Sequence, residues 1–229
     1  IIPEINPQAI GTSKLISNPN CTTAIAVIPL YQIYKKYGLK KVIISTYQST
    51  SGAGNRGMAE LEEETRNVLD GKKVGNELFS HPIPFNVIPH IDAFQENKYT
   101  KEEMKVVWET QKIFGDESIP ISCTCVRIPT MRAHSESIVV ETKKPVKAED
   151  VRKIFGKTPG IVVRDDIKNN VYPMPLTSSE KYDVEVGRIR QNLIFKEHGL
   201  EFFVSGDQLL KGAALNAVQI GELVVKRFK

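Results

Sequence analysis

The second half of the chain, from residue 120 onward, contains a succession of short segments rich in β-branched residues, and this pattern limits the possible folds most. Such segments predict strands, and they cover residues 121–128, 136–142, 160–164, 183–190 and 201–204. Apolar residues at helical spacing accompany them and predict helices at 22–37, 148–155 and 207–228. The sequence therefore predicts an α/β (α+β) fold, with a mixed β-sheet covered by helices.

The first half of the chain predicts fewer strands and longer connections. Pro29 lies inside the helical pattern of residues 22–37, where it predicts a kink or a junction. Thr100 and Glu103 form a capping-box pattern at the start of a further predicted helix. The remaining segments are a strand at 41–47, a glycine-rich loop at 49–57 followed by an acidic helix, and a proline-containing loop at 71–99.

Composition excludes several classes of protein. The 229 residues include 31 basic and 27 acidic side chains, and their net charge of +4 forms no basic block, so no nucleic-acid partner is expected. No apolar run approaches the roughly 18–20 residues that span a bilayer, so we expect a cytoplasmic protein without a membrane partner. The three cysteines lack the spacing of a zinc site, and we expect reduced thiols and no metal.

The segment Ser-Asn-Pro-Asn-Cys-Thr-Thr at 17–23 places Cys21 in the first turn of a predicted helix. Unpaired backbone N–H groups and the positive end of the helix dipole lower the pKa of a thiol there and improve its nucleophilicity. The same amides can stabilise a developing oxyanion. The alternative is a small buried core residue, as most free cysteines are.

A thiol nucleophile needs a base or a cationic partner, which directs attention to the histidines. His134 lies between two predicted strands, seven positions after Arg127, whose planar guanidinium can bind a carboxylate bidentately. Together they could bind an acidic substrate and shuttle its proton, although an isolated histidine is more often structural. His81, His90 and His198 are interpreted as solvated or locally bonded residues.

Two further patterns have both a functional and a structural interpretation. Glu102 and Lys105 lie three residues apart on a predicted helix and face the same way, as substrate ligands or as a solvated surface pair. The glycine-rich segment at 51–57 fits neither the dinucleotide-binding nor the P-loop pattern. Cys123 and Cys125 point to the same side of one strand and are interpreted as core residues.

Four blocks in order resemble the aspartate-β-semialdehyde dehydrogenase family, and the resemblance covers essentially the whole chain. The blocks are SNPNCTT at 17–23, STYQSTSGAG at 45–54, RIPTMRAHSES at 127–137 and GDQLLKGAALNAVQIGE at 206–222, with VGRIR at 186–190 between the last two. The resemblance implies a catalytic and dimerisation domain of the glyceraldehyde-3-phosphate-dehydrogenase-like type. It also implies that most of an N-terminal nucleotide-binding Rossmann domain is missing, which fits a chain that begins at Ile1.

The resemblance divides the chain into three parts. Residues 1–20 correspond to the tail of the Rossmann domain and the lead-in to the cysteine. Residues 21–205 correspond to the catalytic and dimerisation domain, and 206–229 to a C-terminal helix that packs back toward the Rossmann domain. A chain without most of its cofactor domain is expected to turn over poorly by itself.

The family reaction assigns roles to individual residues by resemblance. It is the reductive dephosphorylation of L-aspartyl-4-phosphate to L-aspartate 4-semialdehyde with NADP, in the lysine, methionine and threonine pathway. Cys21 corresponds to the nucleophile that forms the thioester, His134 to the general acid and base, and Gln48 to the residue that orients the intermediate. Asn20 belongs to the oxyanion region beside Cys21.

The remaining roles concern the substrate, the cofactor and the assembly. Arg127 corresponds to the ligand of the substrate carboxylate, Glu102 to that of its ammonium group and Lys105 to that of its phosphate. The residues that approach the nicotinamide end of the cofactor correspond to Ser51, Gly52, Gln208 and Asn216. The resemblance also implies a homodimer or a dimer of dimers.

Two alternatives belong to other classes of function. Another acyl-phosphate reductase, of the N-acetylglutamyl-phosphate reductase type, usually has an aromatic residue after the cysteine, where this chain has Thr22. Glyceraldehyde-3-phosphate dehydrogenase shares the Cys-Thr-Thr run but lacks the block from Arg127 to His134. The second alternative is a non-catalytic dimerisation module, against which the intact set of catalytic residue types argues.

Overall fold

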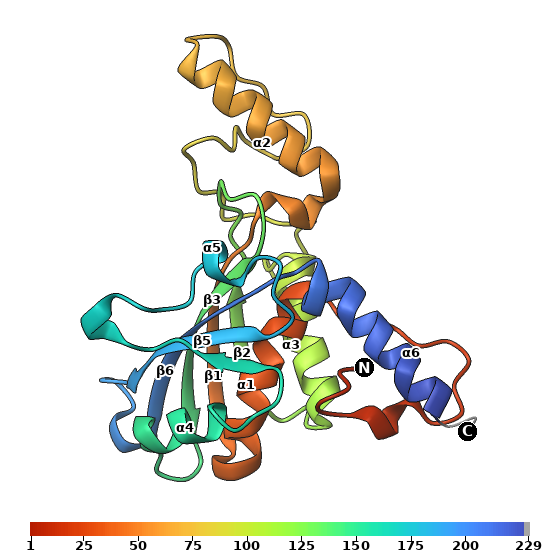
Figure 1. The fold of residues 1–229 in the computed structure, drawn as a ribbon, viewed down its shortest axis with the longest axis vertical. Coiled ribbons are helices and arrows are strands. Elements are labelled where there is room, and N and C mark those ends of the chain that lie inside the picture. Colours follow the sequence, from red (N-terminus) through yellow and green to blue (C-terminus); the bar gives the residue numbers. More distant parts are fainter. Residues whose placement is uncertain (227–229) are drawn as a thin grey trace.

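A six-stranded sheet forms the centre of the computed structural model, which describes residues 1–226 (Figure 1). The strand order is β2-β1-β3-β6-β5-β4. The inner strands pair antiparallel, whereas β2 pairs parallel to β1 and β4 parallel to β5. This arrangement confirms the predicted mixed sheet. The strands are β1 (Leu39–Tyr47), β2 (Ile121–Thr124), β3 (His134–Thr142), β4 (Ile161–Val163), β5 (Val184–Gln191) and β6 (Gly199–Gly206).

The helices lie on one face of the sheet and around its ends. The α-helices are α1 (Cys21–Tyr37), α2 (Gly54–Leu69), α3 (Lys101–Phe114), α4 (Ala148–Phe155), α5 (Pro175–Ser178) and α6 (Leu215–Lys226). The short 3-10 helices are η1 (Pro7–Ile10), η2 (Thr50–Ala53), η3 (Ile167–Asn169) and η4 (Lys196–His198), and η5 (Leu210–Ala214) is a π-helix. No helix within residues 1–226 is long and apolar enough to cross a bilayer.

Helix α1 packs between the sheet and the helices α3 and α4. Its residues from Thr22 to Leu30 are all buried, as expected for a helix that is apolar on nearly every side. The helix runs through Pro29, so the predicted junction does not form, and the packed surroundings stabilise a helix with one missing backbone hydrogen bond. The core formed here fixes the position of Cys21 at the helix start.

The opposite face of the sheet is covered by α5 at one end, where Ser178 Oγ lies 2.7 Å from Ser205 Oγ of β6, and is more exposed along β1. Along β1 the outward side chains alternate with the core side chains, and Ile43 and Tyr47 expose 44% and 37% of their surfaces. The Tyr47 ring lies 5.9 Å from the ring of Phe203 on β6. The sheet therefore presents an apolar surface, which we call the open face.

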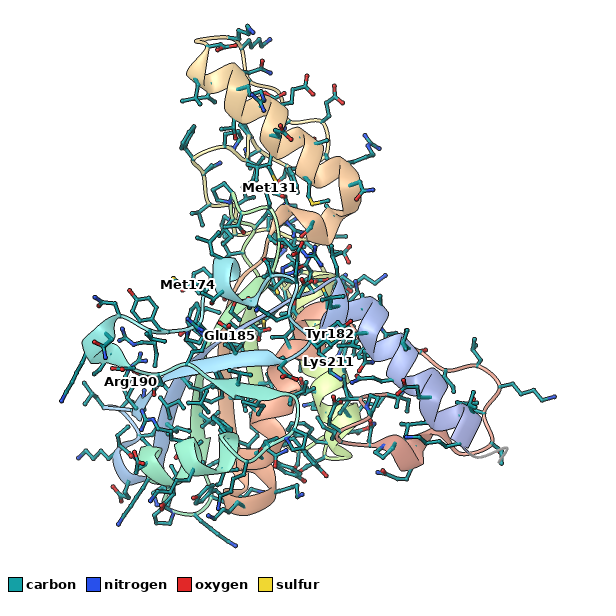
Figure 2. The ribbon with its side chains drawn as sticks, viewed as in Figure 1. Met131, Met174, Tyr182, Glu185, Arg190 and Lys211 are labelled. Carbon is teal, nitrogen blue, oxygen red and sulfur yellow. The ribbon has the colours of Figure 1, made fainter. Side chains whose placement is uncertain are left out.

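Helix α2 and the chain that returns from it to residue 88 project from the body as an arm (Figure 1). A small separate core of Leu61, Ile83 and Ile88 stabilises the arm. Its base is attached where Ile88 exchanges backbone hydrogen bonds with Arg127, of 2.9 and 2.8 Å. Met131, labelled in Figure 2, lies near this base, where its carbonyl accepts a hydrogen bond from Ser51 N. The arm thus grows out of the segments around Arg127 and Ser51.

Several predicted boundaries were wrong by a few residues. The strand predicted at 121–128 ends at Thr124. Beyond it, the backbone of residues 126–128 forms hydrogen bonds with Gln48 and Ile88, which lie outside the strands of the sheet. The loop predicted at 49–57 already becomes α2 at Gly54. The helix predicted at 207–228 begins with the π-turn of η5, and its last two residues lie outside the described part of the chain.

A buried ion pair connects the two ends of the described chain. The ammonium of Lys211, labelled in Figure 2, lies 2.6 Å from Oε1 of Glu4, although only 2% of the Lys211 surface is exposed. Asn216 adds a hydrogen bond of 2.9 Å to the carbonyl of Ile1. Residues 1–20 are therefore fastened to η5 and α6.

Candidate active site

Cys21 is the first residue of α1, and the cap before it is held by α3. Asn20 Oδ1 caps the helix by accepting from Thr23 N at 3.1 Å. The backbone N–H of Asn20 donates to Oε2 of Glu109 at 2.7 Å, and its side-chain amide donates to Oε1 of Glu102 at 2.9 Å. The two glutamates lie two helical turns apart on one face of α3, so α3 fixes the entry of the chain into α1.

Gly212 in η5 packs directly against the nucleophile candidate. A Cβ atom on this glycine would lie 2.9 Å from Cβ of Cys21. Any larger residue would therefore push η5 away from α1. The sequence analysis missed Gly212, although an isolated glycine inside a helical pattern is a signal of close packing.

The surroundings of Cys21 shift its pKa in the direction opposite to the sequence prediction. Desolvation and, next, the negative charge of Glu102 raise its pKa to about 12. The predicted decrease from the helix terminus is therefore wrong here, because the surrounding site opposes the thiolate more strongly than the helix stabilises it. The cysteine remains partly exposed, so a substrate can reach it.

His134 is the first residue of β3 and is completely buried. Its Nδ1 lies 3.1 Å from both the backbone N and the Oγ of Ser49. Its Nε2 is buried and has no hydrogen-bond partner among residues 1–226. Burial and, next, the charge of Arg127 lower the pKa of His134 to about 3, so the imidazole is neutral at physiological pH.

Arg127 lies beside His134, at the base of the arm. Only 6% of its surface is exposed, Nη1 donates to the carbonyl of Ser49 at 2.5 Å, and the guanidinium lies 5.7 Å from the ring centre of Phe79. A Cβ atom on Gly52 would lie 2.9 Å from this Nη1 and 3.0 Å from His134 Nε2. Because Gly52 has no side chain, the Arg127 guanidinium and the His134 imidazole can both lie close to its backbone.

Glu102 is the centre of a cluster of polar side chains that come from α3, from the end of β1 and from the cap of α1. Its Oε1 accepts from Gln48 Nε2 at 3.1 Å as well as from Asn20, and its Oε2 lies 3.4 Å from Lys105 Nζ. Glu102 is 7% exposed, so the interpretation as a solvated surface pair is wrong for it. Lys105 also contacts Asp92 at 3.0 Å. No sequence pattern distinguished Asp92 in the loop before α3.

The four candidate cofactor residues do not form one group. Ser51 accepts a hydrogen bond from Gln208 Nε2, and both are buried next to Ser49. Asn216 is buried elsewhere, where it bonds to Asn18 and Lys211. Gly52 is exposed, and the place that a Cβ would fill beside it is bordered by Arg127 and His134.

Other sequence candidates are structural. The sulfurs of Cys123 and Cys125 lie 3.7 Å apart and are buried, which confirms their interpretation as core residues. His198 Nδ1 lies 3.0 Å from the carbonyl of Thr142, and His90 stacks on Phe94. Within residues 1–226 no three metal-binding side chains come together.

Comparisons with known proteins identify the family of the chain. The family described as semialdehyde dehydrogenase, dimerisation domain, matches residues 29–211. The aspartate-semialdehyde dehydrogenase of Aquifex aeolicus is 46% identical over 99% of this chain and 67% of its own length. That of Bacillus subtilis is 41% identical over 99% of this chain and 68% of its own length. The chain belongs to the aspartate-semialdehyde dehydrogenase family.

Solved structures place the fold in the same family. The aspartate semialdehyde dehydrogenase II of Vibrio cholerae, solved in complex with ASA, has a TM-score of 0.96 and 42% identity, and the match covers 100% of this chain and 68% of that one. The Candida albicans enzyme, solved with NADP, shares the fold, with a TM-score of 0.73 and 23% identity over 98% of this chain and 65% of that one. This aspartate-semialdehyde dehydrogenase chain thus spans about two thirds of the length of its relatives.

Proposed function

We propose that this chain supplies the catalytic residues for the NADP-dependent reductive dephosphorylation of L-aspartyl-4-phosphate to L-aspartate 4-semialdehyde, through a thioester on Cys21, and that it turns over poorly by itself. The observation that carries the proposal is the convergence of three parts. The Cys21 thiol at a helix start interacts electrostatically with Glu102 and Arg127, Arg127 and His134 both approach Gly52, and Glu102 pairs with Lys105. Within the chain, 21–205 acts as the catalytic and dimerisation domain, with 1–20 and 206–229 connecting it to a nucleotide-binding domain.

The charges of the site match those of the substrate. Arg127 supplies a planar fork for the α-carboxylate, and its burial restricts it to few orientations. Glu102 supplies a carboxylate for the ammonium group, and Lys105 a cation for the phosphate. An acidic amino acid with a phosphorylated side chain carries these three groups, which favours it over substrates without an ammonium group.

The first chemical step forms the thioester. The Cys21 sulfur attacks the acyl carbon, the carbon–oxygen bond to phosphate breaks, and phosphate leaves with the bonding electron pair while the thiol proton passes to the surroundings. The backbone N–H groups at the start of α1 stabilise the oxyanion during this step. Gln48, whose Oε1 accepts from Thr46 and whose Nε2 donates to Glu102, orients the acyl group.

The second step reduces the thioester and releases the aldehyde. NADPH, when bound, supplies the hydride that the thioester carbon accepts. His134, as the general acid and base, stabilises the oxygen that becomes negative at this carbon. The carbon–sulfur bond then breaks with its electron pair on sulfur, and the Cys21 thiolate takes up a proton to return to the thiol. Of the residues assigned to the nicotinamide end, Ser51, Gly52 and Gln208 lie together and Gly52 is the most accessible, whereas Asn216 is buried beside Asn18 and Lys211 and would act from there.

We also propose that the open face of the sheet packs against a second copy of the chain. The exposed apolar side chains of Ile43 and Tyr47 and the partly buried ring of Phe203 support this, together with the description of the family domain. Ile43→Glu is expected to convert a dimer to a monomer in sedimentation, whereas Leu176→Glu, on the 92% exposed Leu176, leaves the dimer intact. The free thiols fit a reducing compartment such as the cytoplasm.

An assay of the reverse reaction tests the proposed function. The protein at the full length of its relatives is incubated with aspartate semialdehyde, phosphate and NADP⁺, and NADPH is followed by absorbance. We expect phosphate-dependent NADPH formation that Cys21→Ala reduces by at least about a thousandfold. Cys123→Ala, at a buried cysteine outside the site, is the control and retains activity. A Cys21→Ala protein as active as the parent would contradict the proposal.

A further inference from the structure

We propose that Lys211 is a positioning residue for Cys21, because its buried ammonium holds the turn η5 at the place where Gly212 packs against the nucleophile. Lys211 acts through Gly212 and not by contact with the substrate. The inference rests on the proposed function only for the role of Cys21 in the reaction. The position of Cys21 itself can be measured without any activity.

The ammonium of Lys211 is surrounded by oxygen acceptors. Its Nζ lies 2.6 and 2.7 Å from the two carboxylate oxygens of Glu4, 2.7 Å from Oε1 of Gln219 and 3.1 Å from Oδ1 of Asn216. An ammonium has three N–H groups, so each of these three residues can receive one. Only 2% of the Lys211 surface is exposed, and a buried charge that lost a partner would be left uncompensated. These contacts therefore fix the position of the Lys211 side chain.

The backbone of Lys211 belongs to a π-turn. The N–H of Gly212 donates to the carbonyl of Asp207 at 3.2 Å, and that of Ala214 donates to the carbonyl of Leu209 at 3.0 Å. Both bonds connect residues five positions apart, where an α-helix connects residues four apart. Such turns are rare and are frequent at functional sites. Because Lys211 lies within this turn, the contacts of its ammonium help to hold the turn in place.

Gly212, the next residue along the turn, transmits this position to the nucleophile. A Cβ atom on Gly212 would lie 2.9 Å from Cβ of Cys21 and 3.2 Å from its Cα and its carbonyl oxygen. The glycine backbone thus lies against the carbon that carries the thiol. It limits the space around the Cα–Cβ bond of Cys21, and with it the directions in which the sulfur can point.

A second path leads from the same ammonium to the chain before Cys21. Asn216, which accepts from Lys211, donates through its amide to Oδ1 of Asn18 at 2.7 Å. Asn18 Nδ2 in turn lies 3.3 Å from the carbonyl of Ala213 in η5, which accepts its hydrogen bond. Asn18 lies three residues before Cys21 in the lead-in to α1. The contacts of Lys211 therefore converge on the nucleophile from two directions, through Gly212 and through Asn18.

Carbon NMR of the cysteines measures the position of Cys21 directly. The full-length protein is labelled with ¹³C at the Cβ of cysteine, and the Cys21 signal is assigned by comparison with Cys21→Ser. Lys211→Met removes the ammonium but leaves the Glu4 carboxylate unpaired, so the double variant Lys211→Met/Glu4→Gln, which removes both charges, is measured as well. We expect the Cys21 signal to shift or broaden in both variants, while the signals of the buried Cys123 and Cys125 stay in place. A Cys21 signal in the folded double variant that matches the parent's would overturn the proposal.

Kinetics separate positioning from stability. In the reverse assay we expect kcat of the double variant to fall about tenfold, because the sulfur is less well aligned with the carbonyl carbon. KM for phosphate should stay within about twofold, since its proposed ligand Lys105 lies on α3. Arg152→Met is the control, because it breaks the ion pair of Arg152 with the buried Asp165 and should lower Tm without lowering kcat. A double variant with the parent kcat would show that Lys211 only joins the ends of the chain.

Gly212→Ala tests the path from Lys211 to Cys21. The added Cβ pushes η5 away from α1, so kcat should fall in this variant too. Combined with Lys211→Met/Glu4→Gln, the loss should be smaller than the product of the separate losses, because both changes disturb one contact. A combined loss equal to that product would contradict the route through Gly212. A parent protein that forms no NADPH would refute the proposed function, while the Cys21 NMR signal would still decide on Lys211.

Discussion

The side-chain amide of Asn20 donates a hydrogen bond of 2.9 Å to Oε1 of Glu102. This contact places a buried carboxylate next to the cap of the helix that begins with Cys21. Burial raises the pKa of the thiol most, and the charge of Glu102 raises it further. A substrate ammonium bound at Glu102 would offset that charge. The proposed role of Glu102 as ligand of the substrate ammonium therefore predicts a coupling between substrate binding and formation of the thiolate.

Neutralising Glu102 should make Cys21 more reactive in the absence of substrate. In Glu102→Gln the negative charge is lost, so the pKa of Cys21 falls and the thiolate fraction at pH 8 rises about tenfold for each unit of the decrease. The rate of alkylation by iodoacetamide measures this fraction. Glu117→Gln, at an exposed residue after α3, is the control. Alkylation of Glu102→Gln at or below the parent rate would disprove the coupling.

Removing the carboxylate of Asp92 should weaken phosphate binding. Asp92 Oδ2 accepts from Lys105 at 3.0 Å while Oδ1 accepts from Ala93 N, so the loop positions the ammonium. For Asp92→Asn we expect KM for phosphate to rise about fivefold with little change in kcat, as for a loss of about 1 kcal/mol of binding. The control is Asp70→Asn, which breaks the exposed Asp70–Lys72 pair in the arm. An unchanged phosphate KM in Asp92→Asn would show that Asp92 does not position Lys105.

The buried carboxyl of Glu136 should make the protein less stable as pH rises. Both its oxygens are buried and have no hydrogen-bond partner among residues 1–226, and burial raises its pKa well above 4.5. The folded state then binds a proton that the unfolded state releases above about pH 4.5, so stability is lost as pH increases above that value. Glu136→Gln removes this proton uptake and should gain about 1–3 kcal/mol relative to the parent between pH 5 and 8.

Thermal unfolding across this pH range measures the effect. The parent Tm should decrease with pH more steeply than the Tm of Glu136→Gln, and Glu96→Gln, at an exposed carboxylate, should follow the parent. Parallel Tm curves for the parent and Glu136→Gln would mean that the Glu136 carboxyl is not held in its neutral form.

Local features of the fold could be predicted from the sequence because short-range chemistry determines them. The capping box of Thr100 and Glu103 forms as predicted, and α4 has the predicted bounds Ala148–Phe155. Cys21 begins a helix, as its neighbours indicated. Each of these depends on residues within a few positions of one another.

The electrostatics of the site could not be predicted in this way. The helix terminus alone predicts a low pKa for Cys21, but burial and, next, the charge of Glu102 raise it. Glu102 is 82 positions from Asn20 in sequence and reaches the helix start through its hydrogen bond to that residue. The contact between Gly212 and Cys21 also depends on how η5 packs against α1. These effects require the tertiary structure, because sequence spacing does not show which distant side chains meet.

The central claim is that Cys21 becomes acylated during the reaction. The full-length protein is mixed with aspartate semialdehyde and NADP⁺ without phosphate, so that the hydride leaves but the acyl group stays on sulfur, and the digested protein is analysed by mass spectrometry. We predict an aspartyl adduct on the peptide that contains Cys21, which disappears when phosphate is added and does not form in Cys21→Ala. Stoichiometric NADPH with an unmodified Cys21, or an adduct confined to Cys123 and Cys125, would contradict the account.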